Sequence, residues 1–176
     1  MNIQEVQAKV NQLLGQKAWG VSLGYGSFLT IEFGQPLPSN NEQQKIHGEW
    51  HLWLYNCTWR LEEGDKILAD SEDKRNNLEV AVHRLENLTL QSVNLIPPAW
   101  DMVFAFEHQV VLKLFAIYSQ NYNHWFLYTP DAEVLNVKIL RILSKLCIGI
   151  GDTEFDQLMT LFSIDNGFYL GKTQRL

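Results

Sequence analysis

Two segments of the chain carry apolar residues at helical spacing. In residues 3–14 the apolar positions fall three or four residues apart on one face, which predicts a helix that Gly15 ends. The same spacing over residues 77–87 predicts a second helix, and Asn87 is the other residue type that readily adopts a left-handed helix end. The pattern therefore places a helix ahead of each of two groups of strand-like segments.

Between and after these helices the apolar pattern is typical of strands. Residues 18–23 and 27–33 flank a turn that contains Gly24 and Gly26, and together they predict a hairpin. Residues 47–61 contain half of the six tryptophans and predict one strand that is apolar on both faces. Such a strand is normally central in its sheet, and we expect helices to cover one of its two sides.

A sequence repeat links the two halves of the chain. Residues 51–55 match residues 124–128 at the same offset that takes residues 29–33 to residues 102–106. The predicted fold class is α+β, with internally duplicated units of a helix plus antiparallel strands that form a mainly antiparallel sheet. The predicted layout is one domain, 1–176, with a first repeat unit at 1–70, a second at 71–130 and a helical C-terminal segment at 131–176.

The C-terminal segment is predicted to be helical because Thr129-Pro130-Asp131 is a typical helix start and apolar residues follow at helical spacing. Two alternatives stay open within it. Residues 133–139 are also compatible with the beginning of a strand, and residues 168–170 predict a short last strand.

Composition narrows the classes of function. The 176 residues are 46% hydrophobic and 19% charged, which is ordinary for a globular protein and argues against disorder. The formal net charge of −6, without a run of basic residues, argues against nucleic-acid binding and favours a basic partner, if there is a protein partner. Two distant cysteines, no signal-peptide pattern and no apolar run of membrane-spanning length predict a cytoplasmic protein that does not bind membranes.

The candidate chemistry lies in residues 47–51. His47, Glu49 and His51 share one face of the predicted strand, so neighbouring pairs are able to chelate one ion. In a regular strand His47 and His51 would lie about 13 Å apart, and only a bulge at Gly48 would bring them to one ion. The simpler interpretation is an exposed strand end, because two ligands do not define a metal site. No metal or other cofactor is therefore predicted.

The repeat draws attention to His124, because it matches His51. The two imidazoles would either meet near a pseudo-twofold axis or lie at opposite ends of the sheet. Trp59 and Trp100 lie near the ends of predicted elements, where a tryptophan is suited to contact a partner. The candidate residues for ligand or partner binding are His51, His124, Glu49, Trp59 and Trp100.

No catalytic set is visible in the sequence. Cys57 lies in an apolar setting that would raise the pKa of its thiol and make it inert, and the sequence contains no nucleophile elbow or phosphate-binding loop. We therefore assign no catalytic residue and expect a protein that is not an enzyme.

Three motifs carry a resemblance to other proteins: Trp-Gly-Val-Ser-Leu-Gly at residues 19–24, Phe-Leu-Thr-Ile-Glu-Phe-Gly at 28–34 and Gly-Glu-Trp-His-Leu-Trp-Leu at 48–54. In these motifs the chain resembles small uncharacterised bacterial proteins, some of them similar to immunity proteins that neutralise toxin domains. The resemblance implies a non-enzymatic protein-binding module of immunity or inhibitor type. The alternatives are a small-molecule or metal-binding domain with a site near His51 and His124, and a homodimer that pairs through an exposed sheet face.

Overall fold

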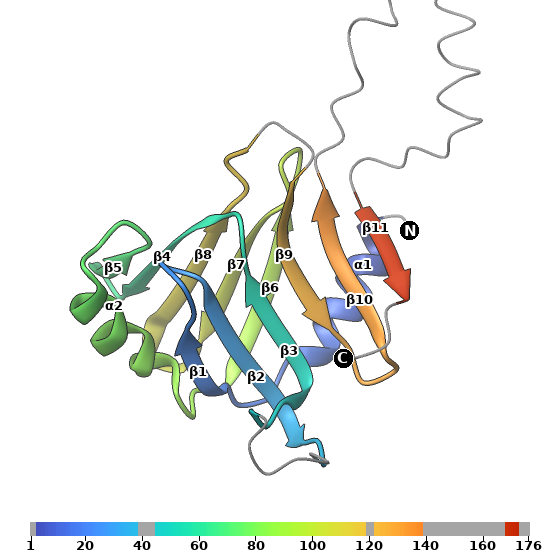
Figure 1. The fold of residues 1–176 in the computed structure, drawn as a ribbon, viewed down its shortest axis with the longest axis horizontal. Coiled ribbons are helices and arrows are strands. Elements are labelled where there is room, and N and C mark those ends of the chain that lie inside the picture. The colour runs from blue at the N-terminus through green and yellow to red at the C-terminus, as the bar shows by residue number, and fades with distance from the viewer. Residues whose placement is uncertain (1–2, 39–44, 119–121, 139–167, 173–176) are drawn as a thin grey trace, which may run out of the picture.

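The computed structural model describes residues 3–38, 45–118, 122–138 and 168–172, which form two antiparallel β-sheets (Figure 1). The six-stranded sheet consists, in spatial order, of β1 (Trp19–Leu23), β2 (Leu29–Pro36), β3 (Gly48–Leu54), β9 (Asn123–Tyr128), β10 (Glu133–Lys138) and β11 (Phe168–Lys172). The five-stranded sheet consists of β5 (Lys66–Asp70), β4 (Thr58–Glu63), β8 (Val110–Phe115), β7 (Asp101–Phe106) and β6 (Leu90–Ile96). The helices are α1 (Ile3–Val10), α2 (Arg75–Val82) and the short 3-10 turns η1 (Asn11–Leu13), η2 (His83–Leu85) and η3 (Glu107–Gln109).

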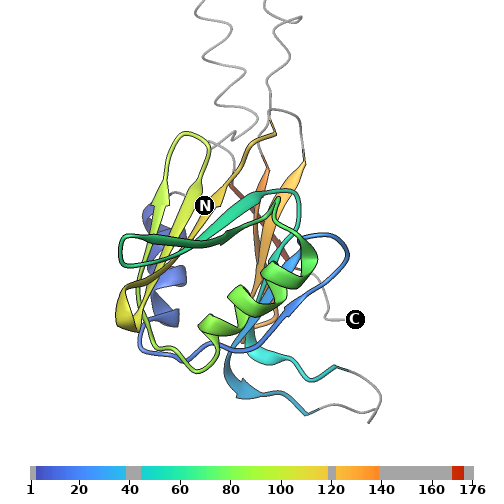
Figure 2. The ribbon, with the colours of Figure 1, turned by 90° about the vertical axis from the view of Figure 1, so that its left-hand side faces the viewer.

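The two sheets lie face to face and bury one apolar core between them (Figure 2). Along β3 every second residue is buried, so that Trp50, Leu52 and Leu54 point into the core. Leu112 and Leu114 alternate in the same way on β8 of the opposite sheet. Because the side chains of a strand alternate, the residues between them lie on the outer faces of the sheets.

The two helices close the open sides between the sheets (Figures 1 and 2). Helix α2 packs against β1 and β5, which are edge strands of different sheets. Helix α1 packs against β6, at the other edge of the five-stranded sheet. Lys9 of α1 forms ion pairs with Asp131 and Glu133, which joins the helix to the start of β10.

The local elements at the beginning of the chain confirm the sequence pattern. The first predicted helix is α1 followed by η1, and Gly15 after it has a φ of 83° in the left-handed region. The predicted hairpin is the antiparallel pair β1 and β2. The second predicted helix is α2 followed by η2, and Asn87 has a φ of 64°.

The α+β class, however, is wrong. The layer that covers the inner face of β3 is a second sheet, whereas each helix is only eight residues long and lies at a sheet edge. An apolar strand face predicts that another layer covers it, but it does not distinguish a helical layer from a second sheet. This ambiguity explains the wrong fold class. No helix within the described residues is long and apolar enough to cross a membrane.

The predicted strand at residues 47–61 is two strands. β3 ends at Leu54 and β4 begins at Thr58 in the other sheet, so the chain crosses between the sheets at residues 55–57. The helical C-terminal segment is also wrong for its described part, because residues 133–138 and 168–172 pair as the antiparallel strands β10 and β11. This pairing confirms the alternative of a strand from residue 133 and the predicted last strand. The rest of the predicted helical segment lies outside the described residues.

The strand order also changes the meaning of the repeat. The first half of the chain places β1, β2 and β3 in the six-stranded sheet and then crosses to form β4 and β5. The second half places β6, β7 and β8 in the five-stranded sheet and then crosses to form β9 and β10. The third strand of the first half therefore corresponds in order to β8. In this order the match between residues 51–55 and 124–128 pairs β3 with a fourth strand, β9, so the strand order does not support that match and the duplication stays a prediction.

Replacing Leu52 by alanine tests the two-sheet core. Leu52 is fully buried between the sheets, and we expect Leu52→Ala to lower the free energy of unfolding by about 2–5 kcal/mol through lost burial and a cavity. Leu14→Ala is the matched control, because Leu14 is exposed. Urea unfolding followed by tryptophan fluorescence measures both, and equal losses in the two variants would contradict the core assigned to β3.

Candidate functional site

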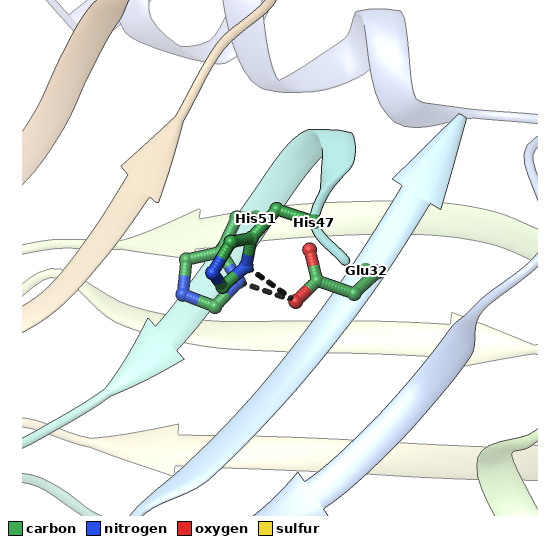
Figure 3. Close-up of side chains that lie close together, drawn as sticks. All are labelled: Glu32, His47 and His51. Carbon is green, nitrogen blue, oxygen red and sulfur yellow. Dashed lines mark hydrogen bonds and ion pairs between the residues drawn. The ribbon is translucent and has the colours of Figure 1, made fainter. Parts of the chain in front are cut away.

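The buried carboxylate of Glu32 is the centre of a polar cluster on the outer face of the six-stranded sheet (Figure 3). Its Oε1 accepts hydrogen bonds from Nδ1 of His51 at 2.8 Å and from Nδ1 of His47 at 3.1 Å. Its Oε2 accepts the backbone N–H of Gly48 at 2.9 Å. The Glu32 side chain is 0% exposed, that of His51 12% and that of His47 45%, so the cluster reaches solvent at His47.

Sheet register and a β-bulge bring these residues together. Glu32 of β2 lies directly opposite His51 of β3. Beyond them the register shifts, because β2 has one residue more than β3 between the pairs Phe33–Trp50 and Pro36–Gly48. His47 precedes β3 at this irregular end, and its ring centroid lies 4.7 Å from that of His51.

The bulge depends on two glycines. Gly34, in the bulge, has a φ of 75°, and a Cβ there would lie 2.5 Å from the carboxylate of Glu49. A Cβ at Gly48 would lie 2.4 Å from the carbonyl oxygen of Phe33. Trp19 stabilises the bulge, because its Nε1–H donates a hydrogen bond to the carbonyl oxygen of Gly34 at 2.9 Å. The backbone can approach this closely only where both positions lack a side chain.

The hydrogen bonds that Glu32 accepts keep its carboxyl group in the ionised form. Burial alone would raise the pKa of its carboxyl, but the bonds from His51, Gly48 and His47 outweigh burial and hold that pKa below its usual value of 4.5. Glu32 is therefore ionised at neutral pH. Because an ionised carboxylate only accepts hydrogen bonds, both Nδ1 atoms carry the hydrogen, and Nε2 of a neutral ring is left with a lone pair.

The same three side chains have the geometry of a metal-ligand set. Glu32, His47 and His51 each offer one ligand atom, and these atoms all lie within 4.8 Å of one another. In a tetrahedral zinc site, bonds of about 2.0–2.1 Å place neighbouring ligand atoms about 3.3 Å apart. The O–N distances of 2.8 and 3.1 Å are a few tenths of an ångström from this value. To bind an ion through Nδ1, each ring has to carry its hydrogen on Nε2 instead, and the ion then takes the place of the two hydrogen bonds to Glu32.

The sequence-predicted site residues have different places in this arrangement. His51 is in the cluster, as is His47. The bulge that this pairing requires is not at Gly48 of β3 but in the neighbouring strand β2, opposite residues 48–50. Glu49 lies outside the cluster, where its Oε2 accepts the N–H of Gln35 at 3.0 Å and so stabilises the bulge. The structure separates His124 from His51. His124 is fully buried, and its carbonyl oxygen accepts the N–H of Tyr55, which lies just beyond the end of β3, four residues and about 13 Å along the strand direction from His51.

The two tryptophans predicted to contact a partner belong to the core. Trp59 on β4 is 1% exposed, and its Nε1–H donates to the carbonyl oxygen of Ser27 at 2.8 Å. Trp100 is also buried, just before β7. Neither side chain has a surface that a partner in solution would reach.

Glu32 is the residue that the sequence analysis missed. It stands between Ile31 and Phe33 in an apolar strand, and nothing in its spacing from His47 or His51 connects it with them. The sequence did contain one signal for Glu32, which was its position between apolar residues. A single acid in the middle of an apolar strand has to be paired when it is buried, and a search for its partners would have started from the hairpin neighbour β3.

Two other features of the described residues are structural. Cys57 is a free cysteine whose thiol pKa is raised to about 12 by burial, so it is protonated and inert. A pocket of about 370 Å³ lies near Ser27, Ser71 and Arg75. The guanidinium group of Arg75 donates to the carbonyl oxygens of Leu23, Gly24 and Gly26, and is thus used to hold the β1–β2 turn.

Comparison of the chain with protein-family models, with curated proteins and with solved structures finds no match. The resemblance to immunity proteins therefore gains no support from these comparisons, and any function has to be argued from the cluster and its surroundings.

Replacing Glu32 by glutamine tests the cluster in the metal-free protein. The substitution removes a charged, fully buried acceptor, and we expect it to lower the free energy of unfolding by about 1–3 kcal/mol at pH 7 in the presence of a chelator. Glu49→Gln is the matched control and should lower it by less, because Glu49 is not fully buried. Urea unfolding measures both variants.

The contribution of Glu32 should also depend on pH. Since its folded-state pKa lies below 4.5, the ionised carboxylate stabilises the fold above that pH, and this contribution is lost as the pH falls through the folded-state pKa. The difference in stability between wild type and Glu32→Gln should therefore shrink below about pH 4.5. A difference that stays constant from pH 6 to pH 3 would show that Glu32 does not titrate as a buried, hydrogen-bonded acid.

Proposed function

We propose that the protein binds a divalent transition-metal ion, with zinc as the reference ion, through Glu32, His47 and His51. One observation carries this proposal: three ligand atoms of the types that zinc prefers lie within 4.8 Å of one another. The hydrogen bonds of Glu32 hold the Nδ1 atoms of both imidazole rings close to one carboxylate oxygen, so an ion can bind there once both rings carry their hydrogen on Nε2.

The ligand types select the class of ion. Two imidazole nitrogens and one carboxylate oxygen suit zinc and its first-row neighbours, whereas calcium and magnesium require sites built mainly from oxygen. Three protein ligands leave a tetrahedral ion with one further position, and such open positions are typical of sites that bind an exchangeable water or ligand. The 45% exposure of His47 supports an open position on the solvent side of the cluster.

The setting that we propose for this function is the cytoplasm. Support comes from the free thiol of Cys57, which a reducing compartment preserves, and from a sequence with only two cysteines.

Removing one ligand tests the metal site. Competition with a chromophoric chelator should give one zinc equivalent per wild-type chain, and His51→Ala should weaken binding by at least about tenfold, since even outer-shell partners contribute that much. His108→Ala is the control, because His108 lies in η3, outside the cluster. If wild type binds no zinc, the cluster is only a hydrogen-bonded network around a buried carboxylate. Equal affinities of His51→Ala and wild type would place the ion elsewhere.

A second candidate function is protein binding, of the inhibitor or immunity type, by the outer face of the six-stranded sheet. The observation that favours it is the group of partly exposed aromatic side chains on this face: Trp53, Tyr55, Phe126 and Tyr128. Tryptophan and tyrosine are enriched among the residues that dominate protein interfaces. The net charge of −6 favours a basic partner.

A pair of matched phenylalanine variants tests this second candidate. Phe126 lies on the outer face of the six-stranded sheet and Phe115 on that of the five-stranded sheet, and both are partly exposed. A partner that binds the first face should co-purify with wild type and with Phe115→Ser, and should be lost from Phe126→Ser. If the partner co-purifies with both variants, the outer face of the six-stranded sheet is not the binding surface. A dimer by light scattering that Phe126→Ser dissociates would identify a second copy of the chain as the partner.

A further inference from the structure

Aromatic side chains continue the outer face of the six-stranded sheet directly from the cluster. Trp53 and Tyr55 follow His51 at alternate positions, in β3 and just beyond its end, and Phe126 and Tyr128 lie on the same face of β9. We refer to Trp53, Tyr55, Phe126 and Tyr128 as the aromatic row.

The rings of the row are in contact with one another and with the cluster. The ring centroid of Tyr128 lies 5.4 Å from that of His51, and the centroids of Trp53 and Phe126 are 5.6 Å apart. Their planes are tilted by 47° and 33°, respectively, so the rings meet at an angle instead of stacking flat. Tilted rings present both faces and edges, which is the geometry in which a further aromatic ring packs well.

The row begins within reach of the proposed ion. His51 pairs with Tyr128 across β3 and β9, and Trp53 pairs with Phe126 one step further along. The diagonal distance from His51 to Phe126 in such a ladder is about 7–8 Å. A small molecule with one ring attached to a metal-binding head spans this distance.

The cluster and the row are open to solvent on the same face. His47 is the most exposed ligand of the cluster, and all four aromatic residues of the row are partly exposed. The solvent-exposed side of the cluster and the apolar ring surface therefore lie on one face of the sheet. Most ligand sites combine a few placed polar groups with apolar and aromatic walls in this way.

We infer that the site takes a small aryl ligand with a chelating oxygen head, of the aryl carboxylate or aryl hydroxamate class. One oxygen of the head occupies the open position of the ion held by Glu32, His47 and His51, a second oxygen raises its coordination from four to five, and the ring packs on Tyr128 and Phe126. This inference rests on the proposed metal-binding function and adds to it the chemical class of the ligand. An aliphatic ligand with the same head would reach the ion but would leave the aromatic row uncovered.

The test compares two ligands that share one head group. The zinc-loaded full-length protein is titrated by calorimetry with benzohydroxamic acid and with acetohydroxamic acid. We expect the aryl compound to bind roughly tenfold more tightly, because contact with two aromatic side chains is added to the same oxygen–zinc bonds. The preference should fall to a few-fold in Phe126→Leu, which keeps an apolar side chain, and should be retained in Phe115→Leu on the opposite sheet.

The outcomes separate this inference from the function on which it rests. If zinc binds with one equivalent but the two hydroxamates bind equally well, the aryl ligand is excluded and the metal site stands. If the aryl preference is as large in Phe126→Leu as in wild type, the ring does not lie on the aromatic row and the inference is overturned. If zinc does not bind, the metal-binding function fails, and the inference fails with it.

Discussion

The cluster depends on one ionised carboxylate that the sheet buries. Glu32 is fully buried on a strand that is otherwise apolar, and an unpaired charge in that position would be strongly destabilising. Three donors compensate it: the rings of His47 and His51 and the backbone N–H of Gly48. Because this one buried acid needs hydrogen-bond donors, the two histidines on either side of the segment opposite the β-bulge turn toward the same point.

The two-sheet architecture determines what this cluster can contact. The inner faces of both sheets are used for the core, so the polar cluster and the aromatic row share the outer face of β2, β3 and β9. The bulge between β2 and β3 then directs His47 over Glu32 and leaves the ring partly in solvent. The buried carboxylate of Glu32, the half-exposed ring of His47 and the adjoining aromatic surface all follow from this single arrangement of strands.

Local pattern was sufficient to predict the two helices and the first hairpin, because helical spacing, Gly15, Asn87 and the β1–β2 turn are short-range signals. Local pattern was not sufficient to predict how the layers are arranged, because a buried inner face of β3 is compatible with cover by a helix or by a second sheet. The cluster shows the same limit. His47 and His51 stand out in the sequence, but Glu32 joins them only through strand register and the bulge, which are non-local properties.

Diffraction from crystals grown with zinc, measured on both sides of the zinc absorption edge, tests the central claim most directly. We expect one anomalous peak at about 2.0–2.2 Å from a carboxylate oxygen of Glu32 and from one ring nitrogen each of His47 and His51. An empty cluster, in which both Nδ1 atoms still donate to Glu32 although zinc is present in excess, would contradict a metal site and leave the three residues as a hydrogen-bonded network.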